Sequence, residues 1–295
     1  MNIKFILCIL ALILVAGVYM IRKDFPYDIE VVPVNNGLWI VNITDWADKD
    51  CYVIVESELG QKKVLLSADK GLVKIDGLKN STPYNLKIYR HDILGRIKYR
   101  SLVKRSAHRN ETDKYIVLVG ASVGKTWDLP GLAERKMDFR VAYGYRGQYA
   151  FDKSNIIKKL VDSPLKPDAV IIKECAAYFP RDTNPSIDMI KQWINILNTS
   201  GIQPILATVV PVTKEHDADR NGSRMESINS FNESIRKYSI DNGIPLLDLQ
   251  QILSNKDEGY LQERFAVPDG LHLKAETYHK HLDIYLYNFV NKLFF

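Results

Sequence analysis

Three hydrophobic patterns follow one another along the chain. Residues 1–24 centre on one long apolar run without charges, whereas residues 25–107 contain short apolar or alternating runs separated by Gly, Asn, Asp and Pro. Over residues 113–295, short apolar runs alternate with stretches in which apolar positions recur every three or four residues, the period of one helix face. The patterns predict a hydrophobic N-terminal segment, an all-β domain and an α/β domain, in that order.

The first segment has the composition of a membrane anchor. Residues 5–21 carry no charge, and Arg22 and Lys23 follow them directly. A run of this length lies at the lower limit for crossing a bilayer and is slightly longer than the core of a typical signal peptide. No clear Ala-x-Ala cleavage motif follows. We expect an uncleaved signal-anchor, so that the protein is exported and held at the membrane of the cell envelope. A cleaved signal, the alternative, would leave it secreted.

The second segment is predicted to form an all-β sandwich. Its apolar runs recur at spacings of roughly ten residues, which is typical of a sandwich of about seven strands. The predicted strands start at Ile29, Leu38, Cys51, Lys63, Leu72, Tyr84 and Arg96. The stretch Leu78–Tyr84 resembles the tyrosine corner of fibronectin type III domains, and Trp39 suits their buried tryptophan. The resemblance implies that both aromatic side chains pack in a core.

The third segment is predicted to adopt a flavodoxin-like, three-layer α/β/α fold. Strands are expected at Tyr115–Val119, Phe139–Tyr143, Ala169–Lys173, Pro204–Val209 and Pro245–Leu247. Helices are expected at Lys153–Ser163, Ser186–Thr199, Met225–Asp241 and Ala275–Phe295. This alternation implies a mainly parallel, five-stranded sheet covered on both faces. Ligands of such sheets bind at the carboxyl ends of the strands.

Composition and charge narrow the classes of function. Of the 295 residues, 46% are hydrophobic and 25% are charged, as in ordinary globular proteins. The net charge is +5, but Lys and Arg are spread along the chain, so nucleic acid is not an expected partner. Outside the anchor, the cysteines are Cys51 and Cys175, in different predicted domains, which does not indicate a disulfide framework. No clustered His and Cys pattern indicates a metal site.

A serine follows the first strand of the α/β segment. Tyr115–Val119 runs into Gly120-Ala121-Ser122-Val123-Gly124, which places Ser122 on a tight turn among small residues. Such a turn lets backbone N–H groups face a developing oxyanion, and a serine becomes a nucleophile beside a general base. Alternatively, Ser122 caps the following helix. The continuation Lys125-Thr126 makes a near-miss of the phosphate-binding P-loop, which has one more residue between its glycines, so nucleotide binding is not favoured.

An acid and an imidazole lie three residues apart near the C-terminus, as Asp269 and His272. On a turn, side chains at this spacing are neighbours. The carboxylate can fix the imidazole tautomer and leave the other ring nitrogen free to take a serine proton. The alternative is that Asp269 caps the last helix while His272 is a partly exposed histidine.

Together these motifs resemble the SGNH, or GDSL-type, hydrolases. Gly120-Ala121-Ser122 is similar to their first block, with Ala121 where an aspartate is usual, and Asp269-Gly-Leu-His272 is similar to the last. Gly147 lies where the second block supplies an oxyanion-hole glycine. The resemblance implies a serine esterase in which Ser122 attacks, His272 acts as base and then acid, and Asp269 orients the ring. It implies no metal or organic cofactor.

The third block departs from the family pattern. Ala177 stands at about the position of the family's asparagine, whose amide donates to the oxyanion. The backbone N–H of Ala177 or the hydroxyl of Tyr178 is a possible substitute. Glu174 and Cys175 also follow a buried strand. Glu174 either lines the site or pairs with a neighbouring cation. Cys175 is either an inert buried thiol or a second nucleophile.

The sequence therefore predicts an exported serine esterase. Its expected substrates are O-acyl esters, acetyl esters among them, carried on carbohydrate, because an esterase-like domain is joined to a fibronectin-like module at a cell surface. The missing asparagine leaves a second hypothesis open, a weakly active or inactive module that binds glycan or a protein partner. A third is acyl transfer to a polymer rather than to water.

Overall fold

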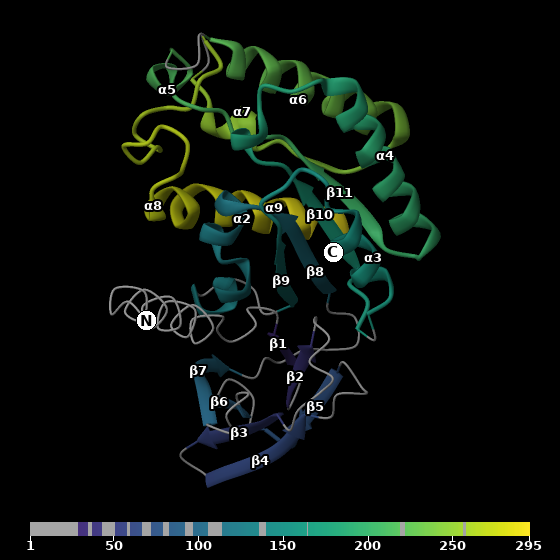
Figure 1. Ribbon diagram of the computed structural model, residues 1–295, viewed down its shortest axis with the longest axis vertical. Coiled ribbons are helices and arrows are strands. Elements are labelled where there is room, and N and C mark those ends of the chain that lie inside the picture. The colour runs from purple at the N-terminus through teal and green to yellow at the C-terminus, as the bar shows by residue number, and fades with distance from the viewer. Residues whose placement is uncertain are drawn as a thin grey trace, which may run out of the picture. The chain divides into compact units, whose positions relative to one another are not determined.

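The computed structural model describes most of the chain. The described residues are 29–34, 37–42, 51–57, 60–66, 72–78, 83–91, 97–105, 114–135, 140–163, 165–218, 222–255 and 258–295. The predicted signal-anchor over residues 1–24 lies outside them. Within these ranges no helix has both the length and the apolar character needed to cross a membrane. The chain separates into two compact units (Figure 1). Of the described residues, 51–66 and 83–104 belong to the first unit, and 30–41, 72–78 and 105–295 belong to the second.

The N-terminal part contains antiparallel strands. Their bounds are β1 Ile29–Val34, β2 Gly37–Asn42, β3 Cys51–Ser57, β4 Gly60–Leu66, β5 Leu72–Asp76, β6 Pro83–His91 and β7 Ile97–Arg105. They form a three-stranded sheet in the order β1-β2-β5 and a four-stranded sheet in the order β4-β3-β6-β7. In β3 and β6 the side chains of Val53, Val55, Tyr84 and Leu86 are buried in alternation with partly exposed neighbours.

Each of the predicted N-terminal strands has a counterpart here. The packing of the two sheets into a sandwich, the domain limits at 25–107 and 113–295 and the likeness to fibronectin type III domains stay predictions.

The α/β domain has the predicted parallel sheet. Its strands are β8 Lys114–Gly120, β9 Val141–Gly147, β10 Ala169–Lys173, β11 Gln203–Ala207 and β12 Leu246–Leu247. The helices are α2 Ser122–Trp127, α3 Ser154–Val161, α4 Thr183–Thr199, α5 Lys214–Ala218, α6 Ser223–Asn242, α7 Leu249–Leu253, α8 Ala275–Thr277 and α9 Asp283–Phe294. The strand order β12-β11-β10-β8-β9 is that of flavodoxin-like sheets. The predicted fold class of this domain is confirmed.

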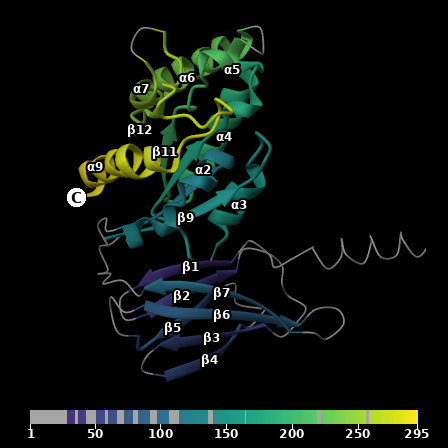
Figure 2. The same ribbon diagram turned by 90° about the vertical axis from the view of Figure 1, so that its left-hand side faces the viewer.

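Helices cover both faces of this sheet, as Figures 1 and 2 show. Ile116 and Leu118 of β8 belong to one core cluster with Trp127 of α2 and Leu286 of α9. Val117 and Val119, whose side chains alternate with these, are equally buried on the opposite face, where α4 and α6 pack against β11. Because β8 is apolar on both faces, it forms a continuous hydrophobic run rather than an alternating one.

Two predicted elements differ most from the observed ones. A strand was expected at Phe139–Tyr143, but β9 spans Val141–Gly147 and pairs with β8 up to the partners Gly120 and Gly147. The end of β9 contains glycines and an arginine, which the hydrophobic pattern does not mark as strand. These residues are part of the strand because they pair with β8. The expected C-terminal helix from Ala275 is interrupted by a π-helical turn at Tyr278–Leu282.

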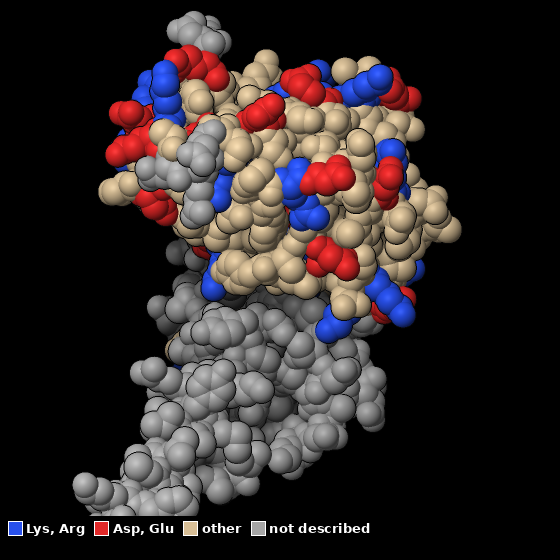
Figure 3. All heavy atoms as spheres, turned by 45° about the horizontal axis from the view of Figure 1, so that its top comes forward, with Lys and Arg blue, Asp and Glu red and all other residues tan. Residues whose placement is uncertain are grey.

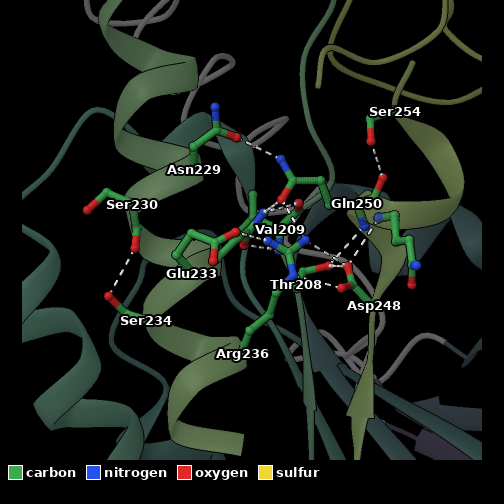
Figure 4. A network of polar contacts seen from close by, with 12 residues as sticks. Thr208, Val209, Asn229, Ser230, Glu233, Ser234, Arg236, Asp248, Gln250 and Ser254 are labelled. Atoms are coloured by element: carbon green, nitrogen blue, oxygen red, sulfur yellow. Dashed lines mark hydrogen bonds and ion pairs between the residues drawn. The ribbon is translucent and has the colours of Figure 1, made fainter. Parts of the chain in front are cut away.

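A polar network joins β11, α6 and α7 (Figure 4). The buried Asn232 side chain pairs with the backbone of Val209 like a peptide group, accepting from its N–H at 2.8 Å and donating to its carbonyl at 3.0 Å. Asn232 also donates to Gln250 at 2.8 Å. Arg236 binds both oxygens of Asp248, at 2.8 and 3.1 Å. The network satisfies backbone groups that the parallel ladder leaves without partners just after β11.

The exposed face of the α/β domain in Figure 3 carries charges of both signs. Lys and Arg side chains are interspersed with Asp and Glu there, and neither sign forms a continuous patch on the part of this face that is described.

Replacing Asn232 with Ala tests the network. The change leaves the N–H and C=O of Val209 buried without their partner, so we expect the free energy of unfolding to fall by about 2–3 kcal/mol. Ser234→Ala is the control, because this exposed hydroxyl bonds only to the Ser230 carbonyl of its own helix, at 2.9 Å. Its effect should stay below about 0.5 kcal/mol. Urea unfolding measures both, and equal small effects would contradict the structural role of Asn232.

Candidate active site

Ser122 is placed by the tight join between β8 and α2. Ala121 is the N-cap residue and Ser122 the first residue of the helix. The glycines on either side leave little room for a larger residue. A Cβ at Gly120 would lie 3.3 Å from the Lys173 carbonyl oxygen, and one at Gly124 would lie 3.1 Å from both Leu118 and Tyr145 side chains. The sequence of small residues thus lets the helix start directly against the sheet.

The end of α2 is held by a buried carboxylate. Asp283, 2% exposed, accepts from the indole Nε1 of Trp127 at 2.8 Å and from Nε of Arg135 at 2.8 Å. Asp283 begins α9, so these contacts fix the helix that bears Ser122 to the C-terminal helix. A charge-assisted pair of this kind is stronger than a neutral hydrogen bond.

Asp269 and His272 lie on a turn held by its own hydrogen bonds. Val267 N–H donates to the His272 carbonyl at 2.9 Å, and Gly270 N–H donates to the Val267 carbonyl at 3.0 Å. Asp269 Oδ1 accepts from the backbone N–H groups of Leu271 and His272, both at 2.8 Å. The carboxylate is therefore oriented by the backbone before it contacts the imidazole.

The structure brings the three predicted residues together. Asp269 Oδ2 lies 2.6 Å from His272 Nδ1, and His272 Nε2 lies 2.9 Å from Ser122 Oγ. An ionised carboxylate only accepts, so Nδ1 carries the proton and Nε2 is the nitrogen that can accept from the serine hydroxyl. Burial raises the pKa of Asp269, but hydrogen bonds from the His272 backbone and ring and from Leu271 outweigh it and hold that pKa below its usual value. The carboxylate is thus charged at neutral pH.

This geometry answers the two helix-cap alternatives. The Ser122 hydroxyl faces His272, and α2 has no side-chain hydrogen bond at its N-cap. The last helical segment has Lys274, not Asp269, as its N-cap residue. His272 is neither a surface residue nor a core residue, since 32% of its side chain is exposed.

The predicted oxyanion residues lie on neighbouring strand ends. Gly147 ends β9 and is the register partner of Gly120 on β8. A Cβ at Gly147 would lie 2.2 Å from the Tyr145 hydroxyl, so a larger residue there would displace the Tyr145 side chain. Ala177 is exposed on the turn Ala176–Tyr178 that follows β10. The Tyr178 hydroxyl donates to the Gln148 carbonyl at 2.9 Å and so connects the loops after β9 and β10.

The side chains of Cys175 and Glu174 have different neighbours: Cys175 lies near Ser122, and Glu174 lies near Lys153. The buried, free thiol of Cys175 lies 3.8 Å from Ser122 Oγ. Glu174, 1% exposed, pairs instead with Lys153 at 2.5 Å, and Lys153 also donates to the carbonyls of Ala150 and Phe151. Burial raises the pKa of Glu174 and lowers that of Lys153, and the attraction between the two charges reduces both shifts without cancelling them. Glu174 therefore has the neighbouring cation that was one of its two alternatives.

Sequence reasoning missed Lys153 and His216. Lys153 precedes α3 with no motif around it, and His216 stands in a polar stretch typical of solvated surface. In the structure His216 Nδ1 lies 2.8 Å from the Asp269 carbonyl oxygen. Only the three-dimensional pairing reveals either contact, and no local pattern could have indicated it.

Within the described ranges, no group of three His, Cys, Asp or Glu side chains is arranged to hold a metal ion. The sequence matches no protein-family model and no curated protein.

The solved structures that are similar to this chain include two from Bacteroides species. One is a GDSL-like lipase from Bacteroides thetaiotaomicron, with 18% identity and a TM-score of 0.51 over 62% of this chain and 91% of that one. The other is a proposed acylhydrolase from Bacteroides fragilis, with 17% identity and a TM-score of 0.51 over 63% of this chain and 91% of that one. The α/β domain has the fold of the GDSL-like lipases. The likeness covers 91% of each of those two structures and leaves more than a third of this chain unmatched.

Substitutions in the Lys153–Glu174 pair test its contribution to stability. Lys153→Met removes the cation that directly contacts the buried Glu174 carboxylate, which should lower the free energy of unfolding by about 3–5 kcal/mol. Adding Glu174→Leu removes the orphaned charge and should restore most of that loss. The control, Lys191→Met, removes an exposed partner of Asp188 and should cost less than about 1 kcal/mol. A double variant as unstable as Lys153→Met alone would contradict this account of the pair.

Proposed function

We propose that this protein is a serine esterase whose nucleophile is Ser122. The observation that carries the proposal is the continuous chain of contacts from Asp269 through His272 to Ser122, at 2.6 and 2.9 Å. These are the distances at which a base can take a serine proton. This series of contacts ends at Ser122, at the carboxyl end of β8. The neighbour of β8 there is β10, and flavodoxin-like sheets bind their ligands at this switch point in the strand order.

The reaction proceeds in two halves. Ser122 Oγ attacks the ester carbonyl carbon while His272 Nε2 takes the hydroxyl proton, and Asp269 stabilises the resulting imidazolium. His272 then returns the proton to the leaving alkoxide, so an alcohol departs and an acyl-serine remains. Water attacks this acyl group, His272 again takes and returns a proton, and the carboxylic acid leaves. The residues supply all the proton transfers without a cofactor.

The oxyanion is proposed to rest on backbone donors. Ser122 is the first residue of α2, where N–H groups have no acceptor within the helix. Gly147, the register partner of Gly120 at the end of β9, and Ala177, on the turn after β10, are the further proposed donors. Losing the family's asparagine amide removes a donor worth about 3 kcal/mol in the transition state. We therefore expect slow turnover of unactivated esters and faster turnover of activated ones.

The proposed substrates are O-acyl esters, acetyl esters among them, on carbohydrate. Support for ester chemistry in general comes from the fold shared with a GDSL-like lipase. Support for an external polymer as substrate comes from the sequence, in which an uncharged run at residues 5–21 and a predicted β-sandwich precede the α/β domain. On this proposal the protein is exported and anchored in the cell envelope by that run.

Ser122→Ala tests the nucleophile. We expect hydrolysis of p-nitrophenyl acetate to fall by on the order of 10⁴-fold or more, because the oxyanion donors alone remain. Asp269→Asn should lose about 10³- to 10⁴-fold, since the amide no longer holds the imidazole in the required tautomer. Ser234→Ala, at a half-buried serine of α6 outside the Ser–His–Asp arrangement, is the control and should keep full activity. Undiminished hydrolysis by folded Ser122→Ala would exclude Ser122 as the nucleophile.

A further inference from the structure

His216 lies outside the Ser–His–Asp arrangement but contacts the loop that bears its acid. It belongs to α5, and its Nδ1 lies 2.8 Å from the backbone carbonyl oxygen of Asp269. Its Nε2 faces the guanidinium of Arg224 on α6. Arg224 is buried and also donates from Nε to the Phe179 carbonyl at 2.9 Å. The His216 ring thus stands between a buried cation and the backbone of Asp269.

The two ring contacts fix the tautomer of His216. A guanidinium only donates, so Nε2 of His216 accepts from Arg224. A backbone carbonyl only accepts, so Nδ1 of His216 donates to Asp269. Both contacts form together only when the imidazole is neutral with its proton on Nδ1. Asp269 is therefore held by two histidines, His272 on its carboxylate and His216 on its backbone carbonyl.

The acid-bearing loop packs closely on the segment that carries His216. Thr213 N–H donates to the Gly270 carbonyl at 2.9 Å. Gly270 has a φ of +66°, and a Cβ there would lie 2.3 Å from Thr213 Oγ1 and 2.7 Å from His216 Cβ. The Asp269 side chain is 48% exposed, and the opposite side of its loop contacts Thr213 and His216. His216 supplies the side-chain hydrogen bond among them.

We propose that His216 is a positioning residue for the esterase reaction. By donating to the Asp269 carbonyl it holds the carboxylate, and through it the His272 ring, at the correct distance from Ser122. The inference rests on the proposed function of these three residues. Active-site geometry tolerates displacements of only about half an ångström, so a small shift of the loop lengthens the Ser122–His272 contact. Because His216 need not touch substrate, its loss should lower kcat and leave KM nearly unchanged.

Two amide substitutions separate positioning from mere stability. In His216→Asn the amide nitrogen occupies about the place of Nδ1 and can still donate to the Asp269 carbonyl. In His216→Gln the amide lies one bond farther out, towards Arg224, and that donor is lost. With p-nitrophenyl acetate and the full-length protein, we expect kcat about 10- to 100-fold lower for His216→Gln, with KM within about twofold. His216→Asn should keep kcat within about threefold of the wild type.

A double-mutant cycle completes the test. In an Asp269→Asn background the loop no longer carries a charged acid, so adding His216→Gln should cause no further loss of kcat. The thermal unfolding midpoint of every variant is measured alongside.

Unchanged kcat in His216→Gln would overturn the proposal. Equal losses of kcat in His216→Asn and His216→Gln that follow a lowered unfolding midpoint would also overturn it. A third contradicting result is that His216→Gln lowers kcat by the same factor in the Asp269→Asn background as in the wild type. The failure of the esterase proposal is distinguishable, because it would appear as undiminished hydrolysis by Ser122→Ala. Activity that depends on Ser122 but not on His216 overturns only the positioning role.

Discussion

One contact between distant parts of the chain sets the strictest requirement on this fold. The Ser122 hydroxyl meets the His272 imidazole at 2.9 Å although 150 residues separate them in sequence. The second contact, between His272 and Asp269, is local and forms within a single turn. The distance between Ser122 and His272 therefore depends on how the C-terminal loop is held at the carboxyl end of β8. Proteins meet such a demand by packing both ends tightly, since loose support is enough to abolish function.

Both ends of that contact have rigid support. Ser122 starts a helix that lies against the sheet because glycines precede and follow it, and the buried carboxylate of Asp283 ties the helix end to α9. The acid-bearing loop rests on the segment from Thr213 to His216 through close contacts at Gly270. The strand order of the sheet sets β8 and β10 side by side, so Cys175 and Ser122 also meet there. Sheet topology and loop packing thus together set the position of Ser122 relative to His272.

The sequence predicted the elements that depend on local pattern, and it misjudged the strand limits and side-chain partners that depend on pairing. Buried parallel strands such as β10, Ala169–Lys173, are continuous apolar runs, so their limits are readable. The limits of β9 were misjudged because its length is set by pairing with β8. Ser122, Asp269 and His272 could be named as candidates because their motifs are short and local, and the structure brings the three side chains together. The partner of Glu174 was unreadable, since Lys153 lies 21 residues away with nothing in the sequence to connect the two.

Labelling with a fluorophosphonate, followed by peptide mass mapping, tests the central claim most directly. The reagent reacts with a serine only where a neighbouring base activates it. The account predicts one adduct per chain, on the peptide containing Ser122, formed much more slowly when His272 is replaced by Gln. Absence of an adduct on the folded protein, or an adduct on another serine that forms at the same rate without His272, would contradict it.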